Sequence, residues 1–230
     1  MARRTKKQAL ATRHTLLDAA ECLFQSQGVS RTTLQHIALR AGATRGAVYW
    51  HFKDKAELFN AMMERVTLPL EAHFNNEGSP DSGDGTGQTG ALAGTRQAIG
   101  MALRQIVTDP QTRRVLEVAT QMVEYVEEHR AIRLRHLAIR RSFLGRVQQG
   151  LDAAAQDAHL TLPVPSALAA LGLHALVDGL IQNWLLDPQA FDLLEAGQCA
   201  VEVYLAGLGF LVEPSNAVIA KNQSVISTSV

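Results

Sequence analysis

The fold is decided by the stretch Thr44-Arg45-Gly46-Ala47-Val48-Tyr49-Trp50-His51-Phe52. Thr44 can cap the first turn of a helix, and Val48 and Phe52 are four residues apart, so they share one helix face. The opposite face carries Arg45 and Tyr49, whose donors and flat ring a purely structural helix does not need. The pattern predicts a short helix over 44–52 with an apolar inner face and a polar outer face.

Two further helices precede this one, and a fourth follows it. The second helix can be capped by Thr32 or Thr33 and ends at Gly42. The first helix ends at Gly28 and follows a basic arm that reaches to about Ala11. The apolar positions of these helices recur with helical spacing: Leu16, Leu17, Ala20, Leu23 and Phe24, then Leu34, Ile37, Ala38 and Ala41, then Leu58, Met62 and Val66. Two helices joined by a short glycine-containing turn indicate a helix-turn-helix.

The outer face of the 44–52 helix has the chemistry that duplex DNA requires. The major groove admits one α-helix, and the phosphates beside it accept hydrogen bonds from hydroxyl, amide and cationic donors. Thr44 and the helix N-terminus can bind a phosphate, and Arg45 can bond either a guanine edge or a phosphate. Gly46 has no side chain and allows the backbone to approach the groove closely. The sequence therefore predicts a helix that reads DNA.

The ring-bearing residues of this helix allow a second interpretation. Tyr49 and Trp50 could pack into the core, and His51 could cap the helix C-terminus. Val48 and Phe52, however, already fill the inner face of so short a helix. We expect Tyr49 and Trp50 to contact DNA, with one edge of the indole able to pack inward.

The net charge of zero conceals an uneven distribution. Residues 1–66 contain eleven Lys and Arg against five Asp and Glu, and the remaining residues contain eleven basic against seventeen acidic residues. The N-terminal region thus carries +6 and the rest of the chain −6. A polyanion is attracted to the first and repelled by the second, so we expect only the N-terminal region to contact nucleic acid.

The rest of the chain also has helical composition, because Ala, Leu, Gln, Glu and Arg dominate and β-branched alternation is scarce. Breaks are expected at the prolines after residues 109, 162 and 187. The expected helices are 95–107, 111–125, 128–155, 166–186 and 190–212. The prediction is an all-α protein with residues 1–54 as its helix-turn-helix domain, basic arm included, and residues 55–212 as a second helical domain.

Two segments are predicted to lie outside the packed helices. An insert at about 75–94 is rich in Gly, Ser and Asp and is expected to be flexible, and the tail 213–230 is expected to be disordered. The insert contains the spacing GxGxxG at Gly85, Gly87 and Gly90. No strand precedes these glycines to present their amides to a pyrophosphate, so no cofactor is expected.

Several protein classes are disfavoured. Cys22 and Cys199 lie in apolar helical stretches, which indicates no disulfide framework. No apolar run approaches the roughly 18 residues of a membrane span, and no signal-type apolar core follows the basic N-terminus. We expect a cytoplasmic protein without membrane contact. His129 and His136 lack a third ligand, so no metal site is expected, and no nucleophile–base pair supports an enzyme.

The helix-turn-helix resembles the DNA-binding signature of the TetR family of transcriptional regulators over residues 13–66. The resemblance rests on Thr33-Leu34-Gln35-His36-Ile37-Ala38 and Ala41-Gly42-Ala43-Thr44-Arg45-Gly46-Ala47-Val48-Tyr49-Trp50-His51-Phe52-Lys53-Asp54-Lys55-Ala56-Glu57-Leu58. Ala43 departs from the Ser or Val of many relatives. The head Ala2-Arg3-Arg4-Thr5-Lys6 and the late stretch Val177-Asp178-Gly179-Leu180-Ile181 are similar to the AcrR/TtgR branch, whose members repress multidrug efflux-pump genes.

The resemblance implies a homodimer that binds a near-palindromic operator and is released by a hydrophobic effector. Carried over by position, the DNA contacts of the family fall on Thr33, Gln35, Thr44, Arg45, Gly46, Tyr49, Trp50, His51 and Lys55. The side chains of Tyr49 and Lys55 are expected to lie outside the core. The effector contacts fall on Leu116, Thr120, Val177, Asp178, Ile181 and Gln182.

Asp178 is unusual, because a carboxylate in an apolar helix is costly unless it has a partner. It is either a polar group of the effector pocket, or it faces a dimer surface or pairs with an arginine. The helices at 166–186 and 190–212 are apolar on more than one face, which favours an intersubunit four-helix bundle. The arginines at 130, 133, 135, 140, 141 and 146 are expected on the solvated face of an amphipathic helix.

The residues and the resemblance together predict a ligand-responsive repressor of a multidrug efflux operon. One alternative is a DNA-binding regulator without a small-molecule effector. The other is an all-helical enzyme.

Overall fold

The expected all-α class is confirmed in the computed structural model, which describes residues 2–76, 89–123 and 130–210 and the side chains of 6–67, 92–123 and 130–210. The regular structure of these ranges is entirely helical. The helices are α1 (Ala2–Gln27), α2 (Leu34–Arg40), α3 (Arg45–His51), α4 (Lys55–Asn76), α5 (Thr89–Thr108), α6 (Pro110–Gln121), α7 (Arg130–Asp157), α8 (Ser166–Leu186) and α9 (Leu193–Gly207). The predicted tail 213–230 and two glycines of the GxGxxG spacing, Gly85 and Gly87, lie outside the described residues.

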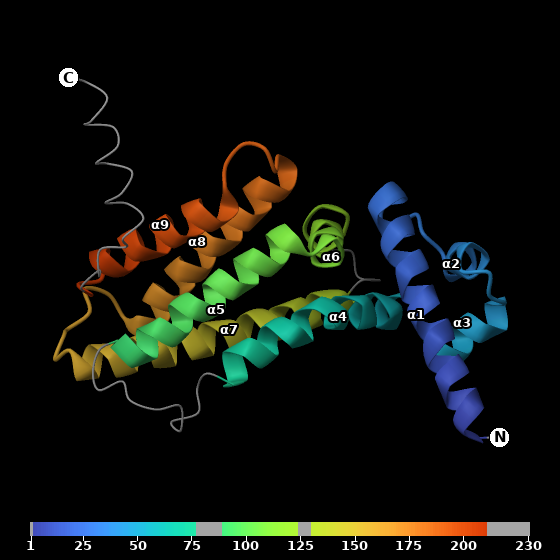
Figure 1. Ribbon diagram of the computed structural model, residues 1–230, viewed down its shortest axis with the longest axis horizontal. Coiled ribbons are helices and arrows are strands. Elements are labelled where there is room, and N and C mark those ends of the chain that lie inside the picture. Colours follow the sequence, from blue (N-terminus) through green and yellow to red (C-terminus); the bar gives the residue numbers. More distant parts are fainter. Residues whose placement is uncertain (1, 77–88, 124–129, 211–230) are drawn as a thin grey trace.

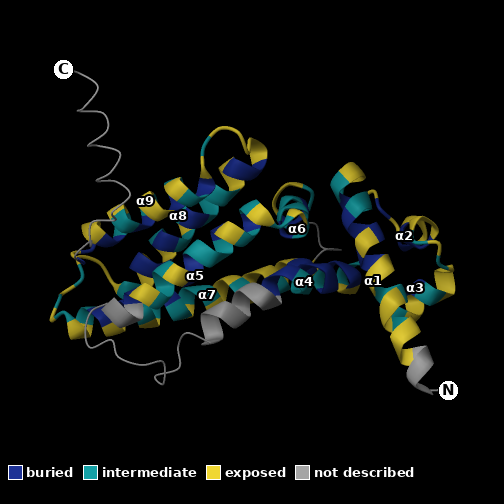
Figure 2. Ribbon diagram, viewed as in Figure 1, coloured by how far each residue is buried: buried dark blue, intermediate teal, exposed yellow. Residues whose placement is uncertain are grey.

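The first three helices form a lobe at one end of the molecule, and α4 leads from this lobe into the body (Figure 1). Leu16 and Phe24 of α1 are fully buried in one apolar core with Val48 and Phe52, and the Phe24 ring lies 5.9 Å from that of Phe59 in α4. This apolar contact holds α3 against the lobe by its inner face and leaves its outer face in solvent (Figure 2).

The predicted helix ends agree with the structure in this lobe. Gly28 and Gly42 have φ angles of +82° and +64°, a conformation that glycine adopts without a Cβ clash. Thr33 caps α2 by accepting a hydrogen bond from the amide of His36 at 3.2 Å. The alternative cap, Thr32, is buried and donates its hydroxyl to the carbonyl of Gly28 at 2.8 Å.

Other boundaries differ from the prediction. The expected basic arm is helical, because α1 begins at Ala2, and the insert is shorter than 75–94, because α4 reaches Asn76 and α5 begins at Thr89. Arg, Lys, Gln and Ala in the arm are good helix formers, and burial of Leu92 extends α5 towards its N-terminus. The other predicted ends are displaced by up to five residues.

The body has its own core, formed where α5, α7, α8 and α9 pack together (Figure 1). The lobe's core continues past the expected boundary at residues 54–55, along α4 to Val66 and onto Val115 and Val118 of α6. Helix α6 therefore packs against the lobe with one face and approaches the body with another. None of the described helices has the length and apolarity of a membrane span.

Candidate nucleic-acid interface and interior cavity

The outer face of α3 carries the predicted DNA-contacting side chains. Thr44 caps the helix by accepting a hydrogen bond from the amide of Ala47 at 3.2 Å. Tyr49 is 49% exposed and Trp50 is 72% exposed, whereas their neighbour Val48 is fully buried. The structure thus confirms the predicted facing of this helix, including the outward position of both aromatic side chains.

A cation–π contact joins Arg45 and Tyr49 on this surface. The Arg45 guanidinium lies 5.6 Å from the centre of the Tyr49 ring, so the two side chains lie together on the outer face. A Cβ atom added at Gly46 would meet only the hydroxyl of Thr44, at 3.9 Å. The surface at Gly46 is open, as close approach to a groove requires. Thr33 and Gln35 are exposed at the start of α2.

His51 lies closer to the core than the sequence indicated. Its ring contacts Trp50 edge to face at a centroid distance of 4.6 Å, and it also lies 6.2 Å from Phe52. Burial, followed by the charge of Arg13, lowers the pKa of His51 below its ordinary value of 6.5. The imidazole is therefore neutral at pH 7 and could meet a phosphate as a hydrogen-bond donor rather than as a cation.

Lys55 has a structural role that was not predicted. Its ammonium donates to the carbonyl oxygens of Val29 at 2.8 Å and Ser30 at 3.3 Å, so it joins the start of α4 to the turn after α1. The side chain lies outside the apolar core, as expected, but it is half-buried and hydrogen-bonded rather than free for DNA alone. A long-range contact of this kind leaves no mark in the local sequence.

A cavity of about 230 Å³ lies in the body between α4, α5, α6, α7 and α8. Five of the six predicted effector contacts line it: Leu116, Thr120, Val177, Asp178 and Ile181. The sixth, Gln182, is exposed and donates to the carboxylate of Asp178 at 2.5 Å. Asp178 therefore lines the cavity and has a hydrogen-bond partner on its own helix, which corrects the alternative in which it pairs with an arginine.

The cavity wall also contains residues that were not predicted. Ile99 and Ile106 of α5 and Phe143 of α7 add apolar surface, and Thr67, His136, Arg140, Arg146 and His174 add polar groups. Arg140 and Arg146 belong to the arginines expected on a solvated face: Arg140 is exposed as expected, Arg146 is partly buried, and both also line the cavity. Helical periodicity can place a residue on a face of α7 but cannot show that α4 and α8 enclose that face. A wider depression of about 520 Å³ at the α7–α8 connection contains none of the six predicted residues.

Comparison with known proteins agrees with this geometry. A family model described as bacterial regulatory proteins of the tetR family matches residues 16–62, and one described as the C-terminal region of MAATS-type transcriptional repressors matches residues 91–210. The HTH-type transcriptional regulator TtgR of Pseudomonas putida is 36% identical over 198 residues, which are 84% of this chain and 90% of TtgR. The chain belongs to the TetR family.

Solved structures extend the likeness of this TetR-family regulator to its whole fold. NalD, the secondary repressor of the MexAB-OprM multidrug efflux pump in Pseudomonas aeruginosa, has a TM-score of 0.76 and 34% identity, with 88% of this chain and 98% of NalD covered. SmeT, the repressor of the Stenotrophomonas maltophilia pump SmeDEF, has a TM-score of 0.73 in its complex with triclosan. That match has 32% identity and covers 89% of this chain and 99% of SmeT. The predicted resemblance to the AcrR/TtgR branch is confirmed.

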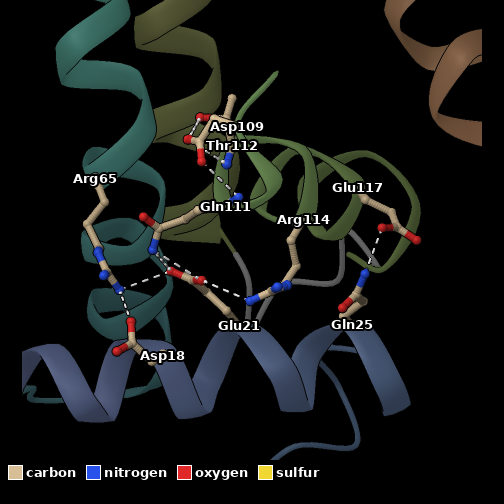
Figure 3. Close-up of polar contacts among 9 residues, drawn as sticks. All are labelled: Asp18, Glu21, Gln25, Arg65, Asp109, Gln111, Thr112, Arg114 and Glu117. Carbon is tan, nitrogen blue, oxygen red and sulfur yellow. Dashed lines mark hydrogen bonds and ion pairs between the residues drawn. The ribbon is translucent and has the colours of Figure 1, made fainter. Parts of the chain in front are cut away.

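A buried polar joint connects the DNA-binding lobe of this TetR-family regulator to α6 (Figure 3). The carboxylate of Glu21 in α1 is 1% exposed and accepts from Arg65 of α4 at 3.0 Å and from Gln111 of α6 at 3.0 Å. Arg114 of α6 lies 3.8 Å from the same carboxylate, and Arg65 also pairs with Asp18 at 2.7 Å. Three helices thus meet at one acidic side chain.

Further contacts strengthen the link between α1 and α6. The Gln25 amide donates to Glu117 at 2.8 Å, and the backbone amide of Val29 donates to the carbonyl of Met122 at 3.2 Å. Burial raises the pKa of Glu21 above 4.5, although the charge of Arg65 and the hydrogen bond from Gln111 oppose this. Side-chain and backbone hydrogen bonds thus tie α6 to the lobe.

Proposed function

We propose that this TetR-family regulator is a ligand-responsive transcriptional repressor that binds a palindromic operator as a homodimer in the cytoplasm. The genes that it controls are those of a multidrug efflux pump, and hydrophobic compounds release it from DNA. The observation that carries this proposal is the outer face of α3, where the exposed Tyr49 and Trp50 stand on a helix whose inner face is buried. A surface with this exposure and with Arg45 beside Tyr49 suits the major groove.

The operator contacts that we propose are the positions of the family motif: Thr33, Gln35, Thr44, Arg45, Gly46, Tyr49, Trp50, His51 and Lys55. Arg45 is the base-reading residue in this proposal, and Gln35 shares this role from α2. The threonine caps and the helix N-termini bind phosphates. Lys55 contributes mainly by holding the start of α4 in place.

The dimer that we propose forms through α8 and α9, within the ranges 166–186 and 190–212. Support comes from large apolar side chains that are exposed on these helices, at Leu168, Leu171, Leu186 and Val203. Two DNA-binding lobes must lie about 34–36 Å apart, or a multiple of this distance, to enter successive major grooves. The dimer sets this spacing.

The effector site that we propose is the cavity of the body. Helix α6 contributes Leu116 and Thr120 to the cavity wall and Gln111 to the polar joint, so one helix contacts both the effector and α1. A compound that fits the cavity only in an arrangement with a different lobe spacing weakens operator binding by its differential affinity. The similarity to NalD and SmeT, both repressors of multidrug efflux pumps, supports this control of an efflux operon.

The experiment that tests operator binding measures affinity for the DNA upstream of the protein's own gene, over a range of salt concentrations. Affinity should fall steeply with salt, because each phosphate neutralised releases a counterion. Tyr49→Ala should abolish specific binding while leaving the melting temperature nearly unchanged, because the ring is half exposed. Leu134→Ala on α7, which also removes an exposed apolar side chain, should bind as the wild type does. Affinity without a salt dependence would contradict the proposal.

The effector response needs a separate measurement. Hydrophobic antibiotics, dyes and plant phenolics are added to the protein–operator complex, and release is followed by fluorescence anisotropy. Release by members of the panel supports the ligand-responsive repressor. Operator binding that no compound affects would favour the alternative of a DNA-binding regulator without a small-molecule effector.

A further inference from the structure

The charged and imidazole groups that line the cavity are mostly basic among the residues whose side chains are described. Two arginines and two histidines of this set stand against one carboxylate: Arg140, Arg146, His136 and His174 against Asp178. The residues after position 66 carry a net charge of −6, so a basic lining runs against the charge of the domain that contains it. Charged groups in a recess with low-dielectric walls focus the electrostatic potential at that recess.

The charge of Arg140 is not balanced by any described residue. On the same helix, Arg135 has a counter-charge in Glu64 at 3.8 Å, and the Nη2 atom of Arg146 donates to the Ser142 hydroxyl at 2.7 Å. No ion pair or hydrogen bond to Arg140 occurs within residues 6–67, 92–123 and 130–210. Asp178 shares the cavity with it but accepts its hydrogen bond from Gln182. Arg140 is thus an exposed cation at the wall of a largely apolar cavity, and its guanidinium has no hydrogen-bond or ion-pair partner among these residues.

A second polar group without a partner lies in the same wall. Thr67 is 7% exposed, and its hydroxyl makes no hydrogen bond to any side chain or backbone group that the structure describes. Met63 and His136 line one small hollow together, and Thr67 and Arg140 each lie one turn further along α4 and α7. Helices α4 and α7 both run from the lobe end of the molecule into the body (Figure 1), which places Thr67 and Arg140 at the same level.

The opposite part of the cavity is apolar. Ile99, Ile106, Leu116, Phe143 and Val177 contribute to its wall. A ligand that satisfies both parts has an apolar body and one compact group that accepts hydrogen bonds from a guanidinium and a hydroxyl. A carboxylate or a phenolate has this chemistry, and charge-assisted hydrogen bonds to such an oxygen are about twice as strong as neutral ones.

We propose that the cavity selects amphipathic monoanions, with the anionic oxygen bound by Arg140 and Thr67 and the apolar body packed among Phe143 of α7 and the aliphatic residues of α5, α6 and α8. This inference rests on the proposed function of the cavity as the effector site and names the class of effector. A cavity of about 230 Å³ is smaller than the roughly 300–1,000 Å³ of typical drug-binding sites, so a small ligand suits it.

The experiment compares three ligands that share one apolar chain and differ in the charge of the head group: octanoate, octan-1-ol and octylammonium. Their dissociation constants for the full-length protein are measured by isothermal titration calorimetry at pH 7. Octanoate should bind about tenfold more tightly than octan-1-ol, and octylammonium should bind most weakly. Equal affinities, or tightest binding of octylammonium, would overturn the proposal.

Two substitutions in the cavity wall and one control outside it test whether the preference for octanoate arises in the cavity. Arg140→Gln should lower the octanoate affinity about tenfold and leave that of octan-1-ol unchanged, whereas Arg141→Gln, at an exposed position outside the cavity, should change neither. Asp178→Asn should raise the octanoate affinity, because it removes the carboxylate among the described lining residues. A preference for octanoate that persists in Arg140→Gln would show that the anion binds elsewhere and would refute the assignment.

The experiments can distinguish a failure of the anion selectivity from a failure of the proposed effector-responsive repressor. Operator release by neutral hydrophobic compounds, together with no preference for octanoate, would refute the anion selectivity and leave the effector-responsive repressor intact. Binding of octanoate with the predicted dependence on Arg140, without any effect on operator affinity, would support the anion site and contradict its role in release.

Discussion

At the scale of single residues, adjacent positions of α3 have opposite environments. Val48 is fully buried and Tyr49 is 49% exposed, a difference that follows from a rotation of about 100° per residue in an α-helix. The inner residue stabilises the lobe and the outer one is available to a partner. Substitutions on the outer face should therefore separate DNA binding from stability.

Gly46 offers a direct separation of these two properties. Gly46→Ala should raise the free energy of unfolding by up to about 1 kcal/mol, because alanine favours the helix and the added Cβ has open space. The same methyl group should hinder close approach to the groove, so operator affinity should fall. Gly100→Ala, also in open helical surface but in α5, should stabilise similarly without a change in operator affinity. Operator binding that is unaffected in Gly46→Ala would show that α3 does not approach DNA at this point.

The buried hydroxyl of Thr67 has no hydrogen-bond partner among the described residues, so a group of the proposed anion site lowers the stability of the fold. Thr67→Val should raise the free energy of unfolding by about 1 kcal/mol in urea denaturation, because it replaces a buried hydroxyl without a partner by an isosteric methyl group. Thr112→Val is the matched control. Thr112 is fully buried, but its hydroxyl donates to Asp109 at 2.6 Å, so its loss should destabilise the protein by about 1–2 kcal/mol. Destabilisation by Thr67→Val would reveal a partner such as an ordered water.

At the scale of elements, α6 is the helix that contacts both the cavity of the body and α1 of the lobe. Its N-terminus is capped by Asp109, whose carboxylate accepts from the amides of Gln111 and Thr112 at 3.1 Å. The Thr112 hydroxyl also donates to this carboxylate, and its hydrogen bond is the largest cause that lowers the pKa of Asp109. The two backbone amides lower this pKa further. The cap fixes the helix start from which Gln111 reaches Glu21 (Figure 3).

Glu21 should make the stability of the joint depend on pH. Its pKa is higher in the folded protein than the ordinary 4.5, so the folded state binds more protons than the unfolded state between the two pKa values. The stabilising contribution is fully present below about pH 4.5 and is lost as the pH rises through the folded pKa. Glu21→Gln has no such titration. The free energy of unfolding of the wild type minus that of Glu21→Gln should therefore be larger at pH 4.5 than at pH 7.

Urea unfolding of both proteins at the two pH values measures this difference. Gln25→Glu is not a suitable control, because it would place a second carboxylate beside Glu117. Asp18→Asn is suitable, because Asp18 pairs with the same Arg65 but is largely exposed, with 60% of its side chain in solvent. If the free energy of unfolding of the wild type minus that of Glu21→Gln is larger at pH 7 than at pH 4.5, the raised pKa of Glu21 is contradicted.

At the scale of the whole molecule, one protomer presents apolar surface that a second copy would cover. Leu168→Glu on α8 should convert the proposed dimer to a monomer, as measured by analytical ultracentrifugation, because a charge in an apolar interface lacks a partner. Operator affinity should fall with it, since two lobes no longer bind together. Leu134→Glu on α7 is the control, because Leu134 is 54% exposed and Leu168 57%. A Leu168→Glu variant that remains dimeric would place the interface elsewhere.

The sequence by itself determined the helical class, the helix-turn-helix and the outward face of α3. Spacing, caps and glycines are local, and the physics of a helix turn is local too. The sequence also indicated five of the residues that line the cavity, through its resemblance to the TetR family.

The tertiary structure alone decided which distant residues meet. It gave Lys55 its carbonyl partners, brought Glu21 against Arg65 and Gln111, and placed the exposed Arg140 at the wall of a cavity. The hydrogen-bonded pairs among these are separated by 25 to 90 positions along the chain. Contacts at such separations depend on how whole helices pack, which periodicity within one helix does not specify.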